Sequence, residues 1–278
     1  MSKTLFTPVP RTVRELIMEV ETGKLGLPDL QRGYVWRAAK VRDLLDSMLK
    51  GYPIGYLMIW DAADDTEKSK TIGIDNKPFG TPKSLVIDGQ QRLTSLYAVM
   101  YGKKIVDAKF NEKQLIISFN PLTRTFAVGD NATKRGAEWI YDISEVFRNE
   151  SKSFAYISEK VQTISDARKK TDATLTDDEK QSIQQNIMDL LSLTGFSIPT
   201  LEISGNSDEE SVADIFVRVN SGREKLGRMI LSLPLSLSIG LRAVRKSWIS
   251  AVARRHRNRE RHTTSCSSPL PPTLCGLL

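Results

Sequence analysis

The run Asp88-Gly89-Gln90-Gln91-Arg92 combines the residue types best suited to chemistry in this sequence. It follows a short apolar stretch, Ser84–Ile87, and opens an amphipathic one, Gln90–Tyr101, so the pattern predicts a strand, a glycine turn and a helix. A helix N-terminus attracts anions, and a cation in its first turn opposes the helix dipole. The position of Arg92 is favourable if a phosphate lies between the two, and the alternative is a capped helix with a surface arginine.

The other side chains of this run suit the same kind of ligand. Gln90 and Gln91 offer neutral donors and acceptors for a base, a ribose or a phosphate oxygen. Asp88 has three open interpretations: it holds Mg²⁺, it orients a water molecule, or it only caps the helix.

Two further polar clusters also stand next to predicted helix ends. Gln31-Arg32-Gly33-Tyr34-Val35-Trp36 precedes a helix, and its aromatic rings either stack on a base or pack against the apolar residues Val41 and Leu44. Arg218-Val219-Asn220-Ser221-Gly222 closes a helix, since Asn and Gly commonly terminate helices. Its functional alternative is that Arg218 and Asn220 face the same pocket as the first cluster.

The elements that must position these clusters alternate between helices and strands, which predicts an α/β (α+β) fold. Apolar spacing predicts helices at Arg11–Glu21, Arg37–Lys50, Gln90–Tyr101, Thr176–Leu193 and Asp208–Asn220, and weaker helical patterns over 138–170. Thr176 and Glu179 have the spacing of a capping box. Strands are expected at Tyr56–Trp60, Ser84–Ile87 and Ile198–Ile203, and a hairpin is expected from Leu115–Phe119 and Thr125–Val128. The expected product is one domain with a helical insertion at about 138–195.

Composition excludes several classes of protein. The 278 residues suit one large domain or two small ones. Two cysteines exclude a disulfide framework and a four-cysteine zinc site, and two histidines argue against a zinc hydrolase or a His-Asn-His nuclease centre. The uncharged run Met229–Leu241 is too short to span a bilayer, and the first residues lack the apolar core of a signal peptide, so we expect no membrane association and a cytoplasmic location.

The net charge of +7 is unevenly distributed. Residues 1–227 carry 31 Lys and Arg against 32 acidic residues, a net of −1, whereas residues 228–278 carry nine against one, a net of +8. One interpretation of 228–278 is a basic arm that binds nucleic acid through phosphate contacts. The other is a tail that is disordered or translated out of frame, because its Arg/Ser/Pro/Leu composition begins abruptly.

Taken in order, the clusters resemble the N-terminal domain of GmrSD-type modification-dependent restriction enzymes. The resemblance rests on LPDLQRGYVW (27–36), VRDLLDSMLKGYPIG (41–55), LVIDGQQRLTSL (85–96) and IFVRVNSGREKL (215–226), and covers about residues 8–227. The DGQQR box is the most specific of these motifs.

The resemblance implies a ParB/sulfiredoxin-like nucleotide-binding fold and a domain that binds and hydrolyses nucleoside triphosphates with Mg²⁺. It implies that the domain helps to sense modified DNA and controls a His-Asn-His nuclease located elsewhere. By analogy, Asp88 and Arg92 are catalytic and Asp88 is the metal ligand. The implied nucleotide-binding residues are Gln31, Arg32, Gly89, Gln90, Gln91, Arg218, Asn220 and Gly222.

The sequence departs from the family after residue 227, where family members continue with an acidic helical region and often a nuclease domain. This chain has neither feature there, so we expect it to lack a nuclease centre of its own. Two alternatives remain open: a ParB-like DNA-binding module without turnover, and an inactive remnant of a truncated or frameshifted gene.

Overall fold

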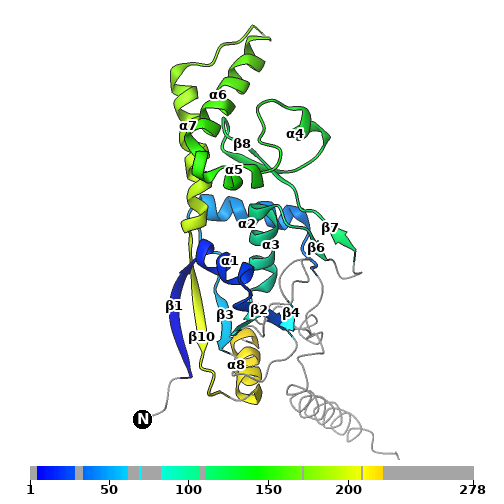
Figure 1. Ribbon diagram of the computed structural model, residues 1–278, viewed down its shortest axis with the longest axis vertical. Coiled ribbons are helices and arrows are strands. Elements are labelled where there is room, and N and C mark those ends of the chain that lie inside the picture. The colour runs from blue at the N-terminus through cyan, green and yellow to red at the C-terminus, as the bar shows by residue number, and fades with distance from the viewer. Residues whose placement is uncertain are drawn as a thin grey trace, which may run out of the picture.

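The computed structural model describes residues 5–28, 34–61, 69–70, 83–106, 111–170, 172–207 and 209–221 (Figure 1). The predictions for Gln31, Arg32, Gly222 and the tail 228–278 lie outside the described residues. In chain order the elements are β1 (Phe6–Thr12), α1 (Val13–Glu21), β2 (Leu25–Pro28), α2 (Ala38–Leu49), β3 (Leu57–Asp61), β4 (Ser69–Lys70), β5 (Ser84–Asp88), α3 (Gln90–Tyr101), β6 (Ile105–Val106), β7 (Glu112–Lys113), β8 (Ile117–Asn120), β9 (Thr125–Val128), α4 (Asn131–Arg135), α5 (Ser144–Arg148), η1 (Glu150–Lys152), α6 (Ser153–Lys169), α7 (Asp177–Ser192), η2 (Leu193–Gly195), β10 (Ser197–Ile203) and α8 (Glu209–Ser221).

Six strands form one mixed sheet in the order β1-β10-β3-β5-β2-β4. β10 runs parallel to β3, and β2 runs parallel to β5, whereas the pairs β1–β10, β3–β5 and β2–β4 are antiparallel. The predicted α/β class is therefore confirmed.

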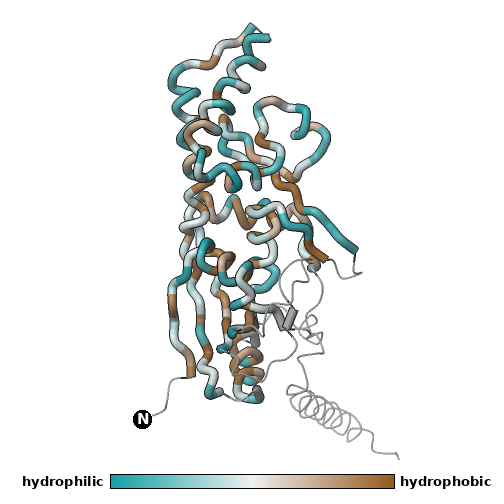
Figure 2. The backbone as a smooth tube through the Cα atoms, viewed as in Figure 1, coloured by the Kyte–Doolittle hydropathy of each residue, from teal (hydrophilic) through white to brown (hydrophobic). Residues whose placement is uncertain are grey.

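The central strands are buried on both faces of this sheet. Along β3, Leu57 and Ile59 belong to the main core, which also contains the buried sides of α1, α2 and α3. The alternate residues Met58 and Trp60 belong to a second cluster, where Val212 of α8 covers them. Strands buried on both faces appear as continuous apolar runs, as β3 does. Along the helices, hydrophobic and hydrophilic stretches alternate, as expected when each helix buries one side (Figure 2).

The helices α5, α6 and α7 occupy the predicted insertion, and α6 and α7 lie at the end of the molecule away from the sheet (Figure 1). Thr176 and Glu179 form the predicted capping box at the start of α7. The predicted hairpin is also present, as β8 paired antiparallel with β9. Whether this region is an insertion into a ParB-like domain stays a prediction.

The helix expected at Arg11–Glu21 is present as α1, but it begins two residues later than predicted. It starts at Val13, because Thr12 caps it in a capping box with Glu15. Arg11 instead belongs to β1, which pairs with β10 at the edge of the sheet. Pro8 and Pro10 concealed this strand in the sequence, since proline cannot donate to a ladder and is tolerated at an edge.

Candidate functional site

The DGQQR box forms the predicted strand, turn and helix. Asp88 ends β5, and Gly89 precedes α3 as its N-cap in the left-handed region at φ 89°. A Cβ atom at this position would lie 2.2 Å from Leu57 Cδ2, so the turn requires glycine both for its backbone angle and for space. The capping interpretation of Asp88 is therefore wrong, because the N-cap is Gly89 and no side chain caps this helix.

The Arg92 guanidinium is held close to this turn. Its Nη1 donates a hydrogen bond of 2.9 Å to the carbonyl oxygen of Ile54, and its Nη2 lies 3.8 Å from Asp88 Oδ2. The latter distance defines an ion pair but exceeds a hydrogen bond. The Arg92 side chain is 13% exposed and that of Asp88 is 25% exposed, so both charges lie near the surface in partly desolvated positions. The structure thus brings together the two residues predicted to be catalytic.

Gln90 has a different environment from the one predicted for a ligand-binding residue. The residue is buried, and its Nε2 donates a hydrogen bond of 2.5 Å to the carbonyl oxygen of Val86. This bond ties the first residue of α3 back to β5. In this structure Gln90 therefore supports the turn from inside.

Gln91 connects the box to the second polar cluster. Its Oε1 accepts a hydrogen bond of 2.9 Å from the backbone N–H of Val35. One turn further along α3, Ser95 donates to the carbonyl oxygen of Gln91 at 2.6 Å. The Tyr34 hydroxyl lies 2.8 Å from Ser95 Oγ, within hydrogen-bond distance. The chain just after Gln31 and Arg32 is thus anchored on the first turns of α3.

The aromatic residues of the second cluster take the packing alternative. Tyr34 is buried in the main core, and Trp36 packs against that core. Burial raises the pKa of Tyr34 to about 12, and the hydrogen bond to Ser95 lowers it by a smaller amount. Lys40 Nζ lies 4.1 Å from the centre of the Trp36 ring, a cation–π contact. Base stacking by Tyr34 would require its removal from the core.

The third cluster lies on α8. Arg218 forms an ion pair with Asp214 of the same helix at 3.2 Å, and its side chain is 80% exposed. The opposite side of α8 packs against the sheet through Val212 and Ile215. The side chain of Asn220 and all of Gly222 are outside the description, so closure of the pocket by these residues stays a prediction.

Sequence reasoning included Ile54 and Gly55 in the motif 41–55 but gave them no role at the site, whereas both lie against the Arg92 guanidinium. A Cβ atom at Gly55 would lie 2.8 Å from Arg92 Nη1, and the φ of Gly55 is +89°. The available signal was the run Gly51-Tyr52-Pro53-Ile54-Gly55, which suggested only the end of a helix. Its second glycine, after the turn was complete, had no explanation in local structure.

The described residues do not contain a preformed metal site. No group of three or more His, Cys, Asp or Glu side chains among them is arranged to hold an ion. Asp88 is the one carboxylate placed beside Arg92 in the box, and a single carboxylate suits a Mg²⁺ ion whose other ligands are phosphate oxygens and water.

A separate surface cleft of about 370 Å³ lies between the ends of α2 and α7. It includes Arg124, which forms an ion pair with Asp189 at 2.8 Å. None of the box residues lines this cleft. Its Arg124–Asp189 pair is therefore an Arg–Asp pair away from the box, which can serve as a control for the Arg92–Asp88 pair.

Comparison with known proteins places these features in a family. The chain is 32% identical over 109 residues to the uncharacterized protein MJ0686 of Methanocaldococcus jannaschii, a match that covers 33% of this chain and 17% of that protein. No helix among the described residues has both the length and the apolar character that crossing a membrane requires. The model of the GmrSD restriction endonuclease N-terminal domain matches residues 13–231, well over half of the chain and all three polar clusters. The chain therefore belongs to the GmrSD restriction endonuclease N-terminal domain family.

Proposed function

We propose that the Asp88–Arg92 turn binds the phosphates of a nucleoside triphosphate and hydrolyses it, within the sensor module of a restriction system against modified phage DNA. Family membership supports the restriction role. The assignment to the ParB/sulfiredoxin-like superfamily is part of the same proposal. The match covers only 17% of the length of MJ0686. The activity and the partners of the whole protein are therefore also part of this proposal.

One observation carries the nucleotide-binding part of the proposal. A guanidinium is held at the N-terminus of α3, where its Nη2 lies 3.8 Å from the Asp88 carboxylate and its Nη1 donates to the carbonyl oxygen of Ile54. Arginine binds phosphate through charge-assisted hydrogen bonds, and the helix N-terminus favours the same negative charge. A phosphate group at this place would satisfy both.

Each residue of the box then has a role that its position allows. Arg92 would stabilise the negative charge that develops on the transferred phosphoryl group. Asp88, at the strand end beside it, would orient the attacking water. Gln91 would hold the segment of Gln31 and Arg32 next to the nucleotide through its bond to Val35. Gln90 and Gly89 would maintain the turn itself.

A Mg²⁺ ion would be held by Asp88 together with phosphate oxygens of the bound nucleotide, and it would supply charge neutralisation of the triphosphate. Such an ion would arrive together with the nucleotide.

DNA cleavage would be carried out by a separate nuclease subunit or domain of the His-Asn-His type. Both histidines of this chain, His256 and His262, lie outside the described residues. Nucleotide turnover at the box would then control that nuclease when modified DNA is sensed.

The test is phosphate release from ATP and GTP by the purified full chain with Mg²⁺, with and without modified DNA. We expect Arg92→Ala and Asp88→Ala each to abolish release while their thermal unfolding stays close to that of the wild type. Arg124→Ala and Asp189→Ala provide the matched control, because they remove another Arg–Asp pair away from the box. Unchanged turnover in both box variants would remove the assignment, and absence of turnover in the wild type would favour an inactive remnant.

The rival function, DNA binding without turnover, depends on a basic surface. The candidate for such a surface in the sequence is the group Lys103, Lys104, Lys109 and Lys113. Lys103 and Lys104 lie near the β6–β7 pair, but Lys103 approaches Glu21 at 4.0 Å and Lys104 approaches Glu112 at 3.0 Å. Lys113 is exposed on β7, and Lys109 lies outside the described residues. This partial neutralisation weakens the case for a DNA surface here. A steep fall of DNA affinity with salt, retained after deletion of 228–278 and lost in Lys103→Ala/Lys104→Ala, would support the rival.

A further inference from the structure

Two glycines from different loops lie against the Arg92 guanidinium. A Cβ atom on Gly55 would lie 2.8 Å from Arg92 Nη1 and 3.4 Å from its Cζ. A Cβ atom on Gly89 would lie 3.3 Å from Nη2. Both glycines have φ +89°, and the carbonyl oxygen of Ile54 accepts the Nη1 hydrogen bond between them. The guanidinium therefore lies close to the backbone at both glycines.

We infer that Gly55 is a positioning residue for the phosphate site, acting through Arg92. The missing side chain of Gly55 lets Nη1 reach the carbonyl of Ile54, and this contact holds Nη2 over Gly89 at the start of α3. An anion bound at that helix end is then aligned with both the arginine and the backbone N–H groups. The inference rests on the proposed function for the identity of the ligand, a terminal phosphate group.

The nature of the contact predicts an effect on the ligand more than on the fold. The atom that an alanine at Gly55 would strike is the far end of a flexible side chain, so Arg92 moves and the backbone stays in place. At Gly89 the atom struck first is Leu57 Cδ2 at 2.2 Å in the core, so an alanine there disturbs packing instead. Gly55→Ala is thus the cleaner test of Arg92 position.

Gly51 is a matched control in the same loop. Its φ of +72° imposes the same kind of backbone strain on an alanine, but a Cβ atom there meets nothing within 4 Å. The difference between Gly55→Ala and Gly51→Ala therefore isolates the contact with Arg92 from the cost of a left-handed alanine.

The experiment measures binding of inorganic pyrophosphate to the full chain by calorimetry. We expect Gly55→Ala to weaken binding at least tenfold and Gly51→Ala to leave it within twofold, while the two variants unfold at similar temperatures. In an Arg92→Ala background, adding Gly55→Ala should cause no further loss, because the two residues act as one unit. If Gly55→Ala does not fold, Arg92→Lys tests the same point. It keeps the charge but cannot span from the Ile54 carbonyl to the turn, and should also weaken binding about tenfold.

Other results would refute either the role of Gly55 or the phosphate site itself. Equal affinities in Gly55→Ala and Gly51→Ala, with weakened binding in Arg92→Ala, would refute the role of Gly55 and leave the phosphate site intact. Wild-type affinity in Arg92→Lys would also refute it, because the held geometry would not matter. Unchanged affinity in Arg92→Ala would refute the phosphate site itself, and the inference with it.

Discussion

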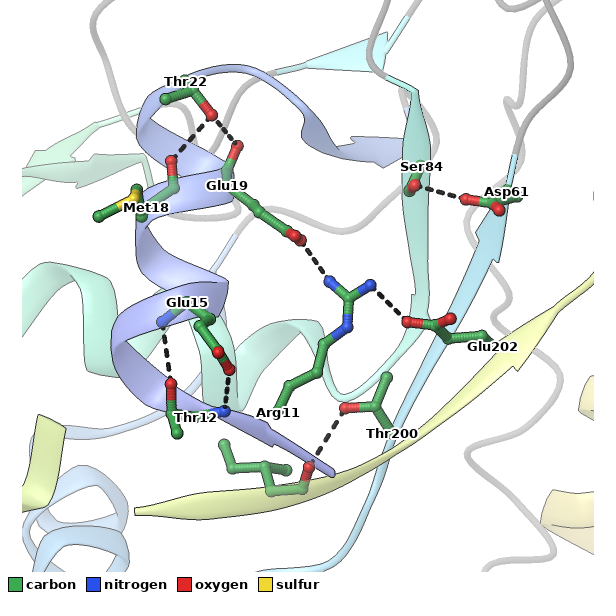
Figure 3. A network of polar contacts seen from close by, with 11 residues as sticks. Arg11, Thr12, Glu15, Met18, Glu19, Thr22, Asp61, Ser84, Thr200 and Glu202 are labelled. Carbon is green, nitrogen blue, oxygen red and sulfur yellow. Dashed lines mark hydrogen bonds and ion pairs between the residues drawn. The ribbon is translucent and has the colours of Figure 1, made fainter. Parts of the chain in front are cut away.

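Arg11 of the edge strand β1 and Arg92 of α3 are both arginines, but they have different surroundings. Arg11 lies between Glu19 of α1 and Glu202 of β10 and pairs with both carboxylates (Figure 3). Arg92 is held by a backbone carbonyl and has Asp88 at 3.8 Å. Arg11 therefore has two carboxylates within ion-pair distance, whereas Asp88 approaches Arg92 only at 3.8 Å and a neutral carbonyl accepts the Arg92 hydrogen bond.

The pKa of Arg11 reflects its ion pairs with Glu19 and Glu202. Burial lowers it, but the attraction of Glu19 and Glu202 together with their hydrogen bonds outweighs burial, so the pKa lies above its ordinary value. Arg11 therefore fastens β1, α1 and β10 together. The two arginines thus differ in how closely carboxylates approach them, and the proposed function assigns the ligand to Arg92.

The largest expected effect separates the two arginines by activity. Arg92→Ala should lower phosphate release by about 10²–10³-fold, as removal of a group that stabilises transition-state charge does. Its free energy of unfolding should change by about 1–2 kcal/mol, since the lost contacts include the charged hydrogen bond to Ile54 and a 3.8 Å ion pair. Arg11→Ala should retain turnover within about twofold. Equal losses of turnover in the two variants would break the comparison.

The stability of the protein should be more sensitive to an added methyl group at Gly89, in the turn before Arg92, than at Gly195. Gly89→Ala combines a left-handed backbone with a clash against Leu57, and we expect a loss of about 2–4 kcal/mol in the free energy of unfolding. Urea denaturation measures it. Gly195→Ala is the control, since a Cβ atom there meets nothing within 4 Å. Near-equal stability of the two variants would contradict the observed packing.

Removal of Arg11 should lower stability without affecting the ligand. Arg11→Ala leaves two partly buried carboxylates without their shared partner, and the three side chains are 23–31% exposed, so we expect a loss of about 1–2 kcal/mol. Arg14→Ala, whose pair with Glu150 is more exposed, should lose less than about 1 kcal/mol. Chemical denaturation of both variants decides, and a smaller loss in Arg11→Ala would show that the Arg11 network contributes little.

The smallest expected effect concerns the anchor of the box. Tyr34→Phe removes the hydrogen bond to Ser95 and should cost about 1 kcal/mol at pH 7. The pKa of Tyr34 is raised to about 12 in the folded state, against about 10 when unfolded. Its stabilising contribution is therefore complete below pH 10 and is lost as the pH rises toward 12.

The advantage of wild type over Tyr34→Phe should accordingly shrink between pH 7 and pH 11, as measured by urea denaturation at both values. Tyr52→Phe, at an exposed position, should match the wild type at pH 7. An advantage that stays constant with pH would show that the Tyr34 hydroxyl is not protected by the fold.

Most elements could be predicted because their signals are local. The spacing of apolar residues located α2 and α3 within one residue at either end, and the capping box located α7. β1 escaped prediction because it exists through pairing with β10, whose residues are distant in sequence, as in the pair Phe6 and Ile203. No local pattern encodes such a partner.

The candidate site divides in the same way. The sequence predicted that Asp88 and Arg92 lie close together, because residues four positions apart across a strand–helix turn are near each other in space. It assigned Gln90 to the ligand, whereas the residue is buried and bonds to Val86. It also gave no role to Gly55, which reaches Arg92 from a different loop.

By itself, the sequence determined the α/β class, the family and the residues that form the Asp88–Arg92 turn, because these follow from short-range spacing and from a specific motif. The tertiary structure decided which arginine pairs with two carboxylates, which glutamine faces inward and which glycine lies against the guanidinium. Those properties depend on atoms that meet only when distant segments pack against each other. Charge, burial and steric contact are therefore set by the fold, whereas secondary structure and motif are set by neighbours in the chain.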